Sequence, residues 1–249
     1  MRERIIGSKI LKLETVSSTN TYLQELLVHE RPVEGTTLIT HNQTSGRGMD
    51  TNRWESEPGS NLTFSFIVYP HFLPPEKQFL LNQAVSLGVM DLILDMVPVK
   101  VTVKWPNDIY IDEKKVCGIL IQNSIQGNRF DYMIAGIGLN VNQVTFSPDI
   151  PNPASLKGIT GNHYDLNTLL DNLLTNLDYR YDQLRSGKGI RIHDEYQQRM
   201  YRFGEWHPYL IHGVKHEAII KGITSHGQLV LESREGNQWY CDVKEVVYQ

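Results

Sequence analysis

Residues 104–122 hold two apolar, strand-like runs separated by a short polar turn at residues 112–114. Asn107 and Asp108 lie at the start of the first run, and Lys115 comes directly after the turn. A carboxylate can hold Mg²⁺ through its water ligands, and a lysine can neutralise phosphate or carboxylate oxygens. The segment therefore predicts a β-hairpin that carries a site for a metal–nucleotide complex. Ordinary solvated charges on a surface hairpin are the alternative, and the segment alone leaves it open.

The rest of the chain mixes strand-like and helix-like periodicity without a strict strand–helix–strand repeat. We predict strands over residues 9–14, 36–41, 62–69, 99–104, 109–111, 116–123 and 132–141, and helices over residues 21–28, 76–96, 167–184 and 190–200. Residues 45–61 and 145–161 read as loops, and a loop as long as the first is usually functional or disordered. This order of elements favours an α+β fold in which helices flank a mixed β-sheet.

The pattern changes after Tyr201. Short alternating runs follow, separated by Gly and Asn turns, at residues 208–210, 217–224, 228–232 and 237–241. Such runs are typical of a small β-barrel-like domain. We therefore expect two domains, over residues 1–200 and 201–249.

The balance of charges indicates the class of partner, and the cysteines indicate the cellular compartment. The formal net charge is −4, and the chain of 249 residues contains no basic block, which argues against nucleic acid as the main partner. Cys117 and Cys241 form no Cys-x-x-Cys pair, so we expect buried free thiols and a reducing cytoplasm. The start of the chain lacks the apolar segment of a signal peptide. No apolar run reaches the roughly 18 residues that a membrane span needs.

Besides the predicted hairpin of residues 104–122, three groups of residues have side chains or backbone suited to binding a ligand. Gly46-Arg47-Gly48 allows backbone N–H groups to converge on an anion, although a solvated Gly-rich loop is the commoner outcome. Hydroxyl and amide groups stand at the start of the first helix and near the end of a strand, where simple capping would also explain them. Glycines in a predicted strand indicate a bulge or a close approach of another group to the backbone. The hydroxyl and amide group consists of Ser18, Thr19, Asn20 and Gln43. The glycine group consists of Gly136 and Gly138.

These motifs together resemble those of the biotin–protein ligases. Lys104-Trp-Pro-Asn-Asp is followed by Lys115 and then by Gly118-Ile-Leu. In the order of the family there are also Ser18-Thr-Asn, Gln43 before Gly46-Arg-Gly, Trp54, and Gly136-Ile-Gly-Leu-Asn. The resemblance covers residues 9–249, and its central motifs are the most specific part. It implies a class II synthetase-like catalytic fold with a small C-terminal SH3-like β-barrel.

The resemblance also implies an activity and assigns residues to it. The activity is formation of biotinyl-5′-AMP from biotin and ATP with Mg²⁺, and transfer of biotin to a lysine of a biotin carboxyl carrier domain. The implied catalytic residues are Lys115, Arg47 and Asp108, the last also holding Mg²⁺ through water. The implied biotin contacts are Ser18, Thr19, Asn20, Gln43, Arg47, Gly48, Met49, Lys115, Gly118, Gly136 and Gly138. The implied ATP or adenylate contacts are Arg47, Arg53, Trp54, Lys104, Asn107, Asp108 and Asn140.

The Gly-rich loop departs from the family pattern at three positions. Met49 stands where another Arg is usual, Thr51 stands where a Gly is usual, and Asp50 places an acid where a base is common. The missing Arg would face the acyl phosphate, and Arg53 is a candidate to replace it. The resemblance thus predicts weaker retention of the intermediate unless another group compensates.

Two other functions remain open at this point. A lipoate or octanoate ligase or transferase shares this kind of fold and reaction logic. A non-catalytic regulator that binds biotin or its adenylate belongs to a different class, and the change at Met49 would then mark lost turnover. We expect no DNA binding, because the catalytic pattern begins by about residue 9, no membrane partner, and a cytoplasmic location; a homodimer is left open.

Overall fold

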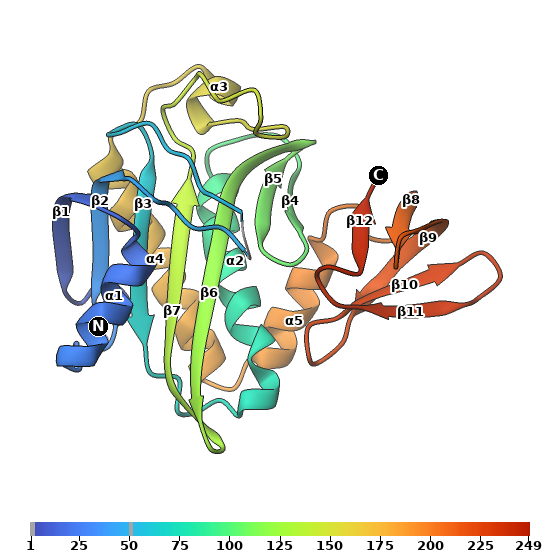
Figure 1. Ribbon diagram of the computed structural model, residues 1–249, viewed down its shortest axis with the longest axis horizontal. Helices are drawn as coiled ribbons and strands as arrows, with labels where there is room; N and C mark the ends of the chain where they lie inside the picture. Colours follow the sequence, from blue (N-terminus) through green and yellow to red (C-terminus); the bar gives the residue numbers. More distant parts are fainter. Residues whose placement is uncertain (1–2, 50–51) are drawn as a thin grey trace.

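The computed structural model describes residues 3–49 and 52–249, and its largest element is a seven-stranded mixed sheet (Figure 1). The strand order is β1-β2-β3-β7-β6-β5-β4. Only β1 and β2 pair in parallel, and the other neighbours are antiparallel. The strands are β1 (Ile10–Val16), β2 (Thr37–Gln43), β3 (Leu62–Val68), β4 (Val101–Lys104), β5 (Asp108–Ile111), β6 (Lys114–Gln126) and β7 (Arg129–Leu139). The predicted α+β class is confirmed.

Helices cover both faces of this sheet. Helix α1 (Thr19–His29) packs on β3 and β7 over a small apolar cluster around Leu23 and Ile67. On the other face, α2 (Phe79–Leu94) contacts β4 and β5, α4 (Leu166–Arg185) lies behind the sheet in Figure 1, and α5 (Gly189–Gln198) packs on α2 and α4. Because β3 lies between the two layers, all seven of its residues are buried, as expected for a strand that is covered on both sides.

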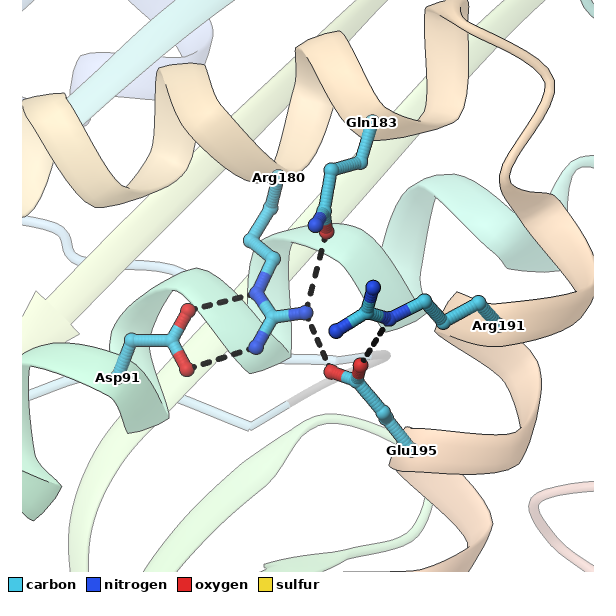
Figure 2. A network of polar contacts seen from close by, with 5 residues as sticks. All are labelled: Asp91, Arg180, Gln183, Arg191 and Glu195. Carbon is cyan, nitrogen blue, oxygen red and sulfur yellow. Dashed lines mark hydrogen bonds and ion pairs between the residues drawn. The ribbon is translucent and has the colours of Figure 1, made fainter.

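The packing of the three large helices explains why α2 is apolar on nearly all sides. A Cβ added at Gly88 of α2 would lie 3.0 Å from the Cα of Leu177, so α2 and α4 approach each other closely. Figure 2 shows the polar cluster that joins them. Arg180 of α4 forms a bidentate ion pair with Asp91 of α2, with N–O distances of 2.6 and 2.8 Å, and also pairs with Glu195 of α5. These partners raise the pKa of the Arg180 guanidinium and hold the three helices together.

The C-terminal segment forms a second, five-stranded antiparallel sheet in the order β11-β10-β9-β8-β12. The strands are β8 (Trp206–Ile211), β9 (Val214–Ile223), β10 (Leu229–Ser233), β11 (Gln238–Cys241) and β12 (Val246–Tyr248). This sheet lies beyond the β4 edge of the large sheet (Figure 1). Trp105 donates from Nε1 to the carbonyl oxygen of Gly227 at 2.8 Å, so the second sheet is anchored directly on the motif of residues 104–108. The domain boundary at residues 200/201 stays a prediction.

Several elements differ from the sequence-based expectations. The predicted helix over residues 76–96 is a short 3₁₀ turn, Pro75–Lys77, followed by α2. The predicted loop over residues 145–161 contains a short helix, α3 (Leu156–Thr160), which is capped by Ser155. Helix α3 and strand β12 have five and three residues, which is too short to show periodicity. Strand β6 continues to Gln126 and β7 begins at Arg129, beyond the predicted limits at residues 123 and 132, because these segments pair with each other, whereas β7 ends at Leu139, before the predicted residue 141.

Two other expectations can be compared with the structure. Cys117 and Cys241 are buried free thiols, as predicted, and burial raises the pKa of both thiol groups. Within residues 3–49 and 52–249, no helix is long and apolar enough to cross a membrane.

Candidate active site

A cavity of about 340 Å³ lies over the face of the large sheet where β6 and β7 meet the start of α1. Most of the residues predicted from the sequence line it. They are Ser18, Thr19, Asn20, Gln43, Arg47, Gly48, Met49, Arg53, Trp54, Asn107, Asp108, Lys115, Gly118, Gly136 and Gly138. The lining also includes residues to which the sequence assigned no contact: Pro106, Ile119, Leu120 and Ile137 belong to the recognised motifs, whereas Asn52, Thr63, Val243 and Lys244 do not. The structure thus brings together segments up to 226 positions apart in the chain, from Ser18 to Lys244.

One end of the cavity is polar and is built from the first turn of α1 and the end of β2. Ser18 is the N-cap residue of α1 and accepts a hydrogen bond from the backbone N–H of Thr21. The backbone N–H of Thr19 donates to Gln43 Oε1 at 2.9 Å, and its hydroxyl lies 3.2 Å from the same oxygen. Capping therefore does occur here, and the same residues also line the cavity.

Two residues behind this polar end were missed from the sequence. Ser65 Oγ of β3 lies 2.6 Å from Thr19 Oγ1 and 2.6 Å from Asn20 Oδ1. Asn20 Nδ2 in turn donates to Gln122 Oε1 of β6 at 2.8 Å. A signal for Ser65 was present, because it is a polar residue in the middle of an apolar strand, between Phe64 and Phe66.

The floor of the cavity is bare backbone at its glycines, which lie under the side chains of Trp54 and Asn20. Gly118 of β6 and Gly138 of β7 stand opposite each other, and the indole of Trp54 covers both. A Cβ at Gly138 would lie 2.2 Å from Trp54 Cε2, and a Cβ at Gly136 would lie 2.2 Å from Asn20 Oδ1. Trp54 and Asn20 thus pack against this bare backbone, and contact of Gly136 and Gly138 with biotin stays a prediction.

The other end of the cavity carries the charges of the predicted hairpin. Lys115 Nζ and Asp108 Oδ2 form an ion pair at 2.8 Å, and both side chains are about one-quarter exposed. The ammonium group of Lys115 also lies 5.8 Å from the ring centroid of Trp54. Asn107 donates from its side-chain amide to the carbonyl oxygen of Ile119, which fixes the turn that places Asp108. The hairpin is formed as predicted, with its two charges paired to each other.

The Gly-rich loop consists of two parts with different anchoring. Residues 46–49 and 52–54 lie side by side, with Arg47 paired to Arg53 in a β-bridge and both side chains exposed. The part that follows is tied to the body of the protein, since Asn61 Nδ2 donates to Gln143 Oε1 at 2.6 Å and Glu57 N donates to the same oxygen at 3.0 Å. The departures at Asp50 and Thr51 lie outside the described residues.

Two predicted nucleotide contacts, Lys104 and Asn140, do not line the cavity. The ammonium group of Lys104 lies 5.2 Å and 4.8 Å from the ring centroids of Tyr110 and Tyr248, and burial lowers its pKa. Asn140 donates from Nδ2 to the carbonyl oxygen of Ala154 at 3.0 Å, so it holds the loop before α3. A role of Lys104 and Asn140 at the nucleotide stays a prediction.

The donor set fits Mg²⁺ only as an ion bound mainly by phosphate and water. No group of three or more His, Cys, Asp or Glu in the described part of the chain could hold a metal ion. Asp108 is the carboxylate at the cationic end, and Mg²⁺ that accompanies a nucleotide commonly uses one or two carboxylates. A hydrated Mg²⁺ carried by nucleotide phosphates is therefore compatible with this end of the cavity.

The curated relatives of the chain are bacterial and other ligases of the biotin type. It is 31% identical over 186 residues to the bifunctional ligase/repressor BirA of Bacillus spizizenii, covering 73% of this chain and 56% of that protein. It is 28% identical over 194 residues to the biotin–[acetyl-CoA-carboxylase] ligase of Mycobacterium tuberculosis, covering 75% and 71%. The chain thus spans about half the length of the Bacillus relative.

Solved structures and a family model extend the comparison. The biotin protein ligase of Aquifex aeolicus in complex with biotin and ATP is similar with a TM-score of 0.79 and 27% identity, covering 97% of this chain and 99% of that one. The model of the biotin/lipoate A/B protein ligase family matches residues 13–140, just over half of the chain. The predicted family is confirmed by these matches: the chain belongs to the biotin/lipoate A/B protein ligase family.

Proposed function

We propose that this protein is an ATP-dependent biotin–protein ligase, which forms biotinyl-5′-AMP and transfers the biotinyl group to a lysine of a carrier domain. The observation that carries the proposal is that the cavity, followed along β6, has charged groups at one end and neutral hydrogen-bonding groups at the other. Lys115 stands at one end of this strand segment and Leu120, whose carbonyl accepts from Asn20, at the other. The side chain of Lys115 reaches Gly118, because a Cβ there would lie 3.5 Å from Lys115 Cε, and Gly118 is two residues, or roughly 7 Å at the usual strand rise, from Leu120. The cavity therefore suits an elongated acid with a hydrogen-bonding ring.

The polar end favours a cyclic urea over the dithiolane ring of lipoate. A cyclic urea offers two N–H donors and one carbonyl acceptor, whereas a dithiolane offers neither. The hydroxyl and amide groups of Thr19, Asn20 and Gln43 gather at this end. A site built to hydrogen-bond its ligand rejects an analogue that leaves its polar groups unpaired.

The cationic end suits the first chemical step. In that step a carboxylate oxygen of biotin forms a bond to the α-phosphorus of ATP, the bond to the bridging oxygen breaks, and pyrophosphate leaves. Both reactants are anionic, so Lys115 and Arg47 would offset their repulsion and the charge that develops on phosphorus. For Lys115 to do so, its ion pair with Asp108 must loosen. Mg²⁺, held by phosphates and by Asp108 through water, would supply further neutralisation.

The second step transfers the acyl group. The ε-amine of a carrier lysine attacks the acyl carbon, the bond to the phosphate oxygen breaks, AMP leaves, and the nitrogen loses a proton. Residues 46–54 would cover the mixed anhydride and keep water away from it. Val243 and Lys244, between β11 and β12, border the same cavity, so the second sheet would help to form the entrance.

Transfer to a carrier tests the proposal. The protein is incubated with labelled biotin, MgATP and a biotin carboxyl carrier domain, and a carrier whose acceptor lysine is replaced by arginine serves as the control. We expect label on the first carrier alone. Transfer of labelled lipoate or octanoate to the equivalent lipoyl carrier, together with no transfer of biotin, would indicate a lipoate or octanoate ligase or transferase instead. Binding of biotin without transfer in a single turnover would point to a regulator.

A further inference from the structure

A buried chain of hydrogen bonds runs behind the polar end of the cavity, from β3 and β6 to the first turn of α1. Ser65 is fully buried on the face of β3 opposite to that of Phe64 and Phe66. Ser65 contacts Thr19 and Asn20, which is itself bonded to Gln122. Neither Ser65 nor Gln122 lines the cavity, so any effect of the two residues on a ligand has to act through Thr19 and Asn20.

Counting donors fixes the direction of each bond. Asn20 Nδ2 has two hydrogens, which it donates to the carbonyl oxygen of Leu120 at 3.3 Å and to Gln122 Oε1 at 2.8 Å. The opposite end of this amide, Oδ1, therefore faces Ser65 and accepts its hydroxyl hydrogen at 2.6 Å. Because a serine hydroxyl has a single hydrogen, the hydroxyl of Thr19 supplies the hydrogen of its 2.6 Å contact with Ser65. The Thr19 hydroxyl then does not donate to Gln43 Oε1 at 3.2 Å, and this oxygen keeps the backbone N–H of Thr19 as its donor.

The surrounding backbone does not permit the reverse orientation of Asn20. A flipped amide would place Oδ1 against the carbonyl oxygen of Leu120, where two acceptors would face each other without a hydrogen. Gly136 provides the space that the observed orientation needs, because any Cβ there would collide with Asn20 Oδ1. The amide of Gln43 is fixed in the same way, since its Oε1 accepts from the backbone N–H of Thr19. The polar end thus presents one fixed pattern of donors and acceptors.

We propose that Ser65 and Gln122 are positioning residues that fix this pattern and thereby set the preference of the cavity for a cyclic urea. The inference rests on the proposed function and adds two residues that determine specificity without touching the ligand. Removing the hydroxyl of Ser65 leaves the buried Asn20 Oδ1 without its donor, and the hydroxyl of Thr19 is left with Gln43 Oε1 as its partner. An unpaired buried oxygen is costly, so Asn20 would take another rotamer, Thr19 would turn toward Gln43, and the pattern would be lost.

Calorimetric titration of the full chain tests the role of Ser65. The ligands are biotin, dethiobiotin, which keeps the cyclic urea and lacks the second ring, and MgATP. Ser65→Ala should weaken binding of both ureas by about tenfold, the equivalent of one buried hydrogen bond, and leave ATP binding within about twofold of wild type. Ser86→Ala, which removes a buried serine bonded to Asn82 within α2, is the matched control and should change neither ligand.

A pair of variants at Gln122 provides the second readout. Gln122→Leu removes the acceptor for Asn20 Nδ2 and should weaken binding of the ureas by about threefold to tenfold. Gln122→Glu keeps an oxygen acceptor at the same place and should restore binding to within about twofold of wild type. If Ser65→Ala does not fold, as judged by circular dichroism, this pair alone decides the outcome.

The results separate the two proposals. Wild-type protein that binds no biotin contradicts the proposed function itself. Wild-type protein that binds biotin, together with Ser65→Ala or Gln122→Leu that binds it equally well, contradicts the positioning role alone. An equal loss of affinity for biotin and ATP also contradicts it, because it would mean general damage to the fold.

Discussion

The two ends of the cavity differ in how their polar groups are partnered. At the polar end, Thr19, Asn20 and Gln43 are held by bonds from behind and beside them, so their orientations are set before a ligand arrives. At the cationic end, Lys115 is paired with Asp108, and Trp54 lies on the glycine floor. One end is thus preorganised, and the other is occupied by contacts within the protein.

We therefore assign recognition of the acid to the polar end and the chemical step to the cationic end. A preorganised end spends little free energy on ordering when the ligand binds. The cationic end has to exchange its internal contacts for those with carboxylate and phosphate, which is the usual behaviour of a closing loop. Changes at the cationic end should therefore alter the rate of adenylate formation, and changes at the polar end should alter the choice of acid.

Replacing Lys115 should have the largest effect. Lys115→Ala removes the cation nearest the glycine floor and should lower adenylate formation by on the order of 10²–10³-fold, as for other electrostatic groups at a reacting centre. The thermal midpoint should change little, because the partly exposed pair with Asp108 contributes about 1 kcal/mol or less. Single-turnover formation of the adenylate measures the effect, and Lys114→Ala is the neighbouring control. A folded Lys115→Ala that keeps the wild-type rate would remove the residue from the mechanism.

Met49→Arg should slow release of the intermediate. An arginine at this position could pair with the acyl phosphate, and a charged hydrogen bond of this kind contributes about 1.5–3 kcal/mol, or roughly tenfold to a hundredfold in the release rate. Stray labelling of nearby lysines should fall by a similar factor. An unchanged release rate would show that Arg53 or another group already contacts the phosphate, and Met49→Leu controls for the loss of the thioether.

The two parts of the Gly-rich loop should respond differently to ligands. Residues 46–54 should be cut readily by a protease in the free protein, and biotin with MgATP should slow the cutting by about tenfold or more. Residues 55–61 should be resistant in both states, because Asn61 and Gln143 hold them. Mass spectrometry of the fragments identifies the cut positions. Equal cutting of residues 46–54 with and without ligands would contradict closure of this loop.

Glycine substitutions in the floor should give the smallest and most graded effect. Gly138→Ala places a methyl group 2.2 Å from the indole of Trp54, whereas Gly118→Ala places it at 3.0 Å. The first variant should displace Trp54 and shift its fluorescence, with biotin affinity lower by a few-fold, and the second should do less. Trp54→Phe identifies the part of the signal that belongs to this residue. Identical spectra for wild type and Gly138→Ala would mean that Trp54 does not rest on the floor in solution.

The sequence could predict those parts of the site that local patterns encode. The hairpin with Asp108 and Lys115, the cap at Ser18 and the glycine positions each have a signal within a few residues, and the cavity contains all of them. The remaining residues of the cavity could not be predicted, because tertiary contacts bring them there. Lys244 reaches the cavity only because the second sheet docks beside the β4 edge, which no short motif records.

The side chains of Lys104 and Asn140 show what a motif leaves undetermined, and their contacts with the nucleotide stay predictions. A motif places a residue near a site, whereas packing decides where its side chain goes. Lys104 lies among Tyr110 of β5, Tyr248 of β12 and Tyr201, which lies between α5 and β8, and Asn140 is bonded to the loop before α3. Ser65 has a local signal as a polar residue in an apolar strand, but its partners Thr19 and Asn20 become apparent when β3 and α1 lie side by side.

Pyrophosphate exchange with biotin and with lipoate tests the division between the two ends most directly. Exchange of labelled pyrophosphate into ATP requires the cationic end to form the adenylate and the polar end to accept the acid. We predict exchange with biotin, and a specificity constant for lipoate that is lower by on the order of 10³-fold or more, because a dithiolane leaves the polar end unpaired. Exchange with lipoate equal to or faster than with biotin would contradict the account of the polar end. No exchange with either acid would contradict the account of the cationic end.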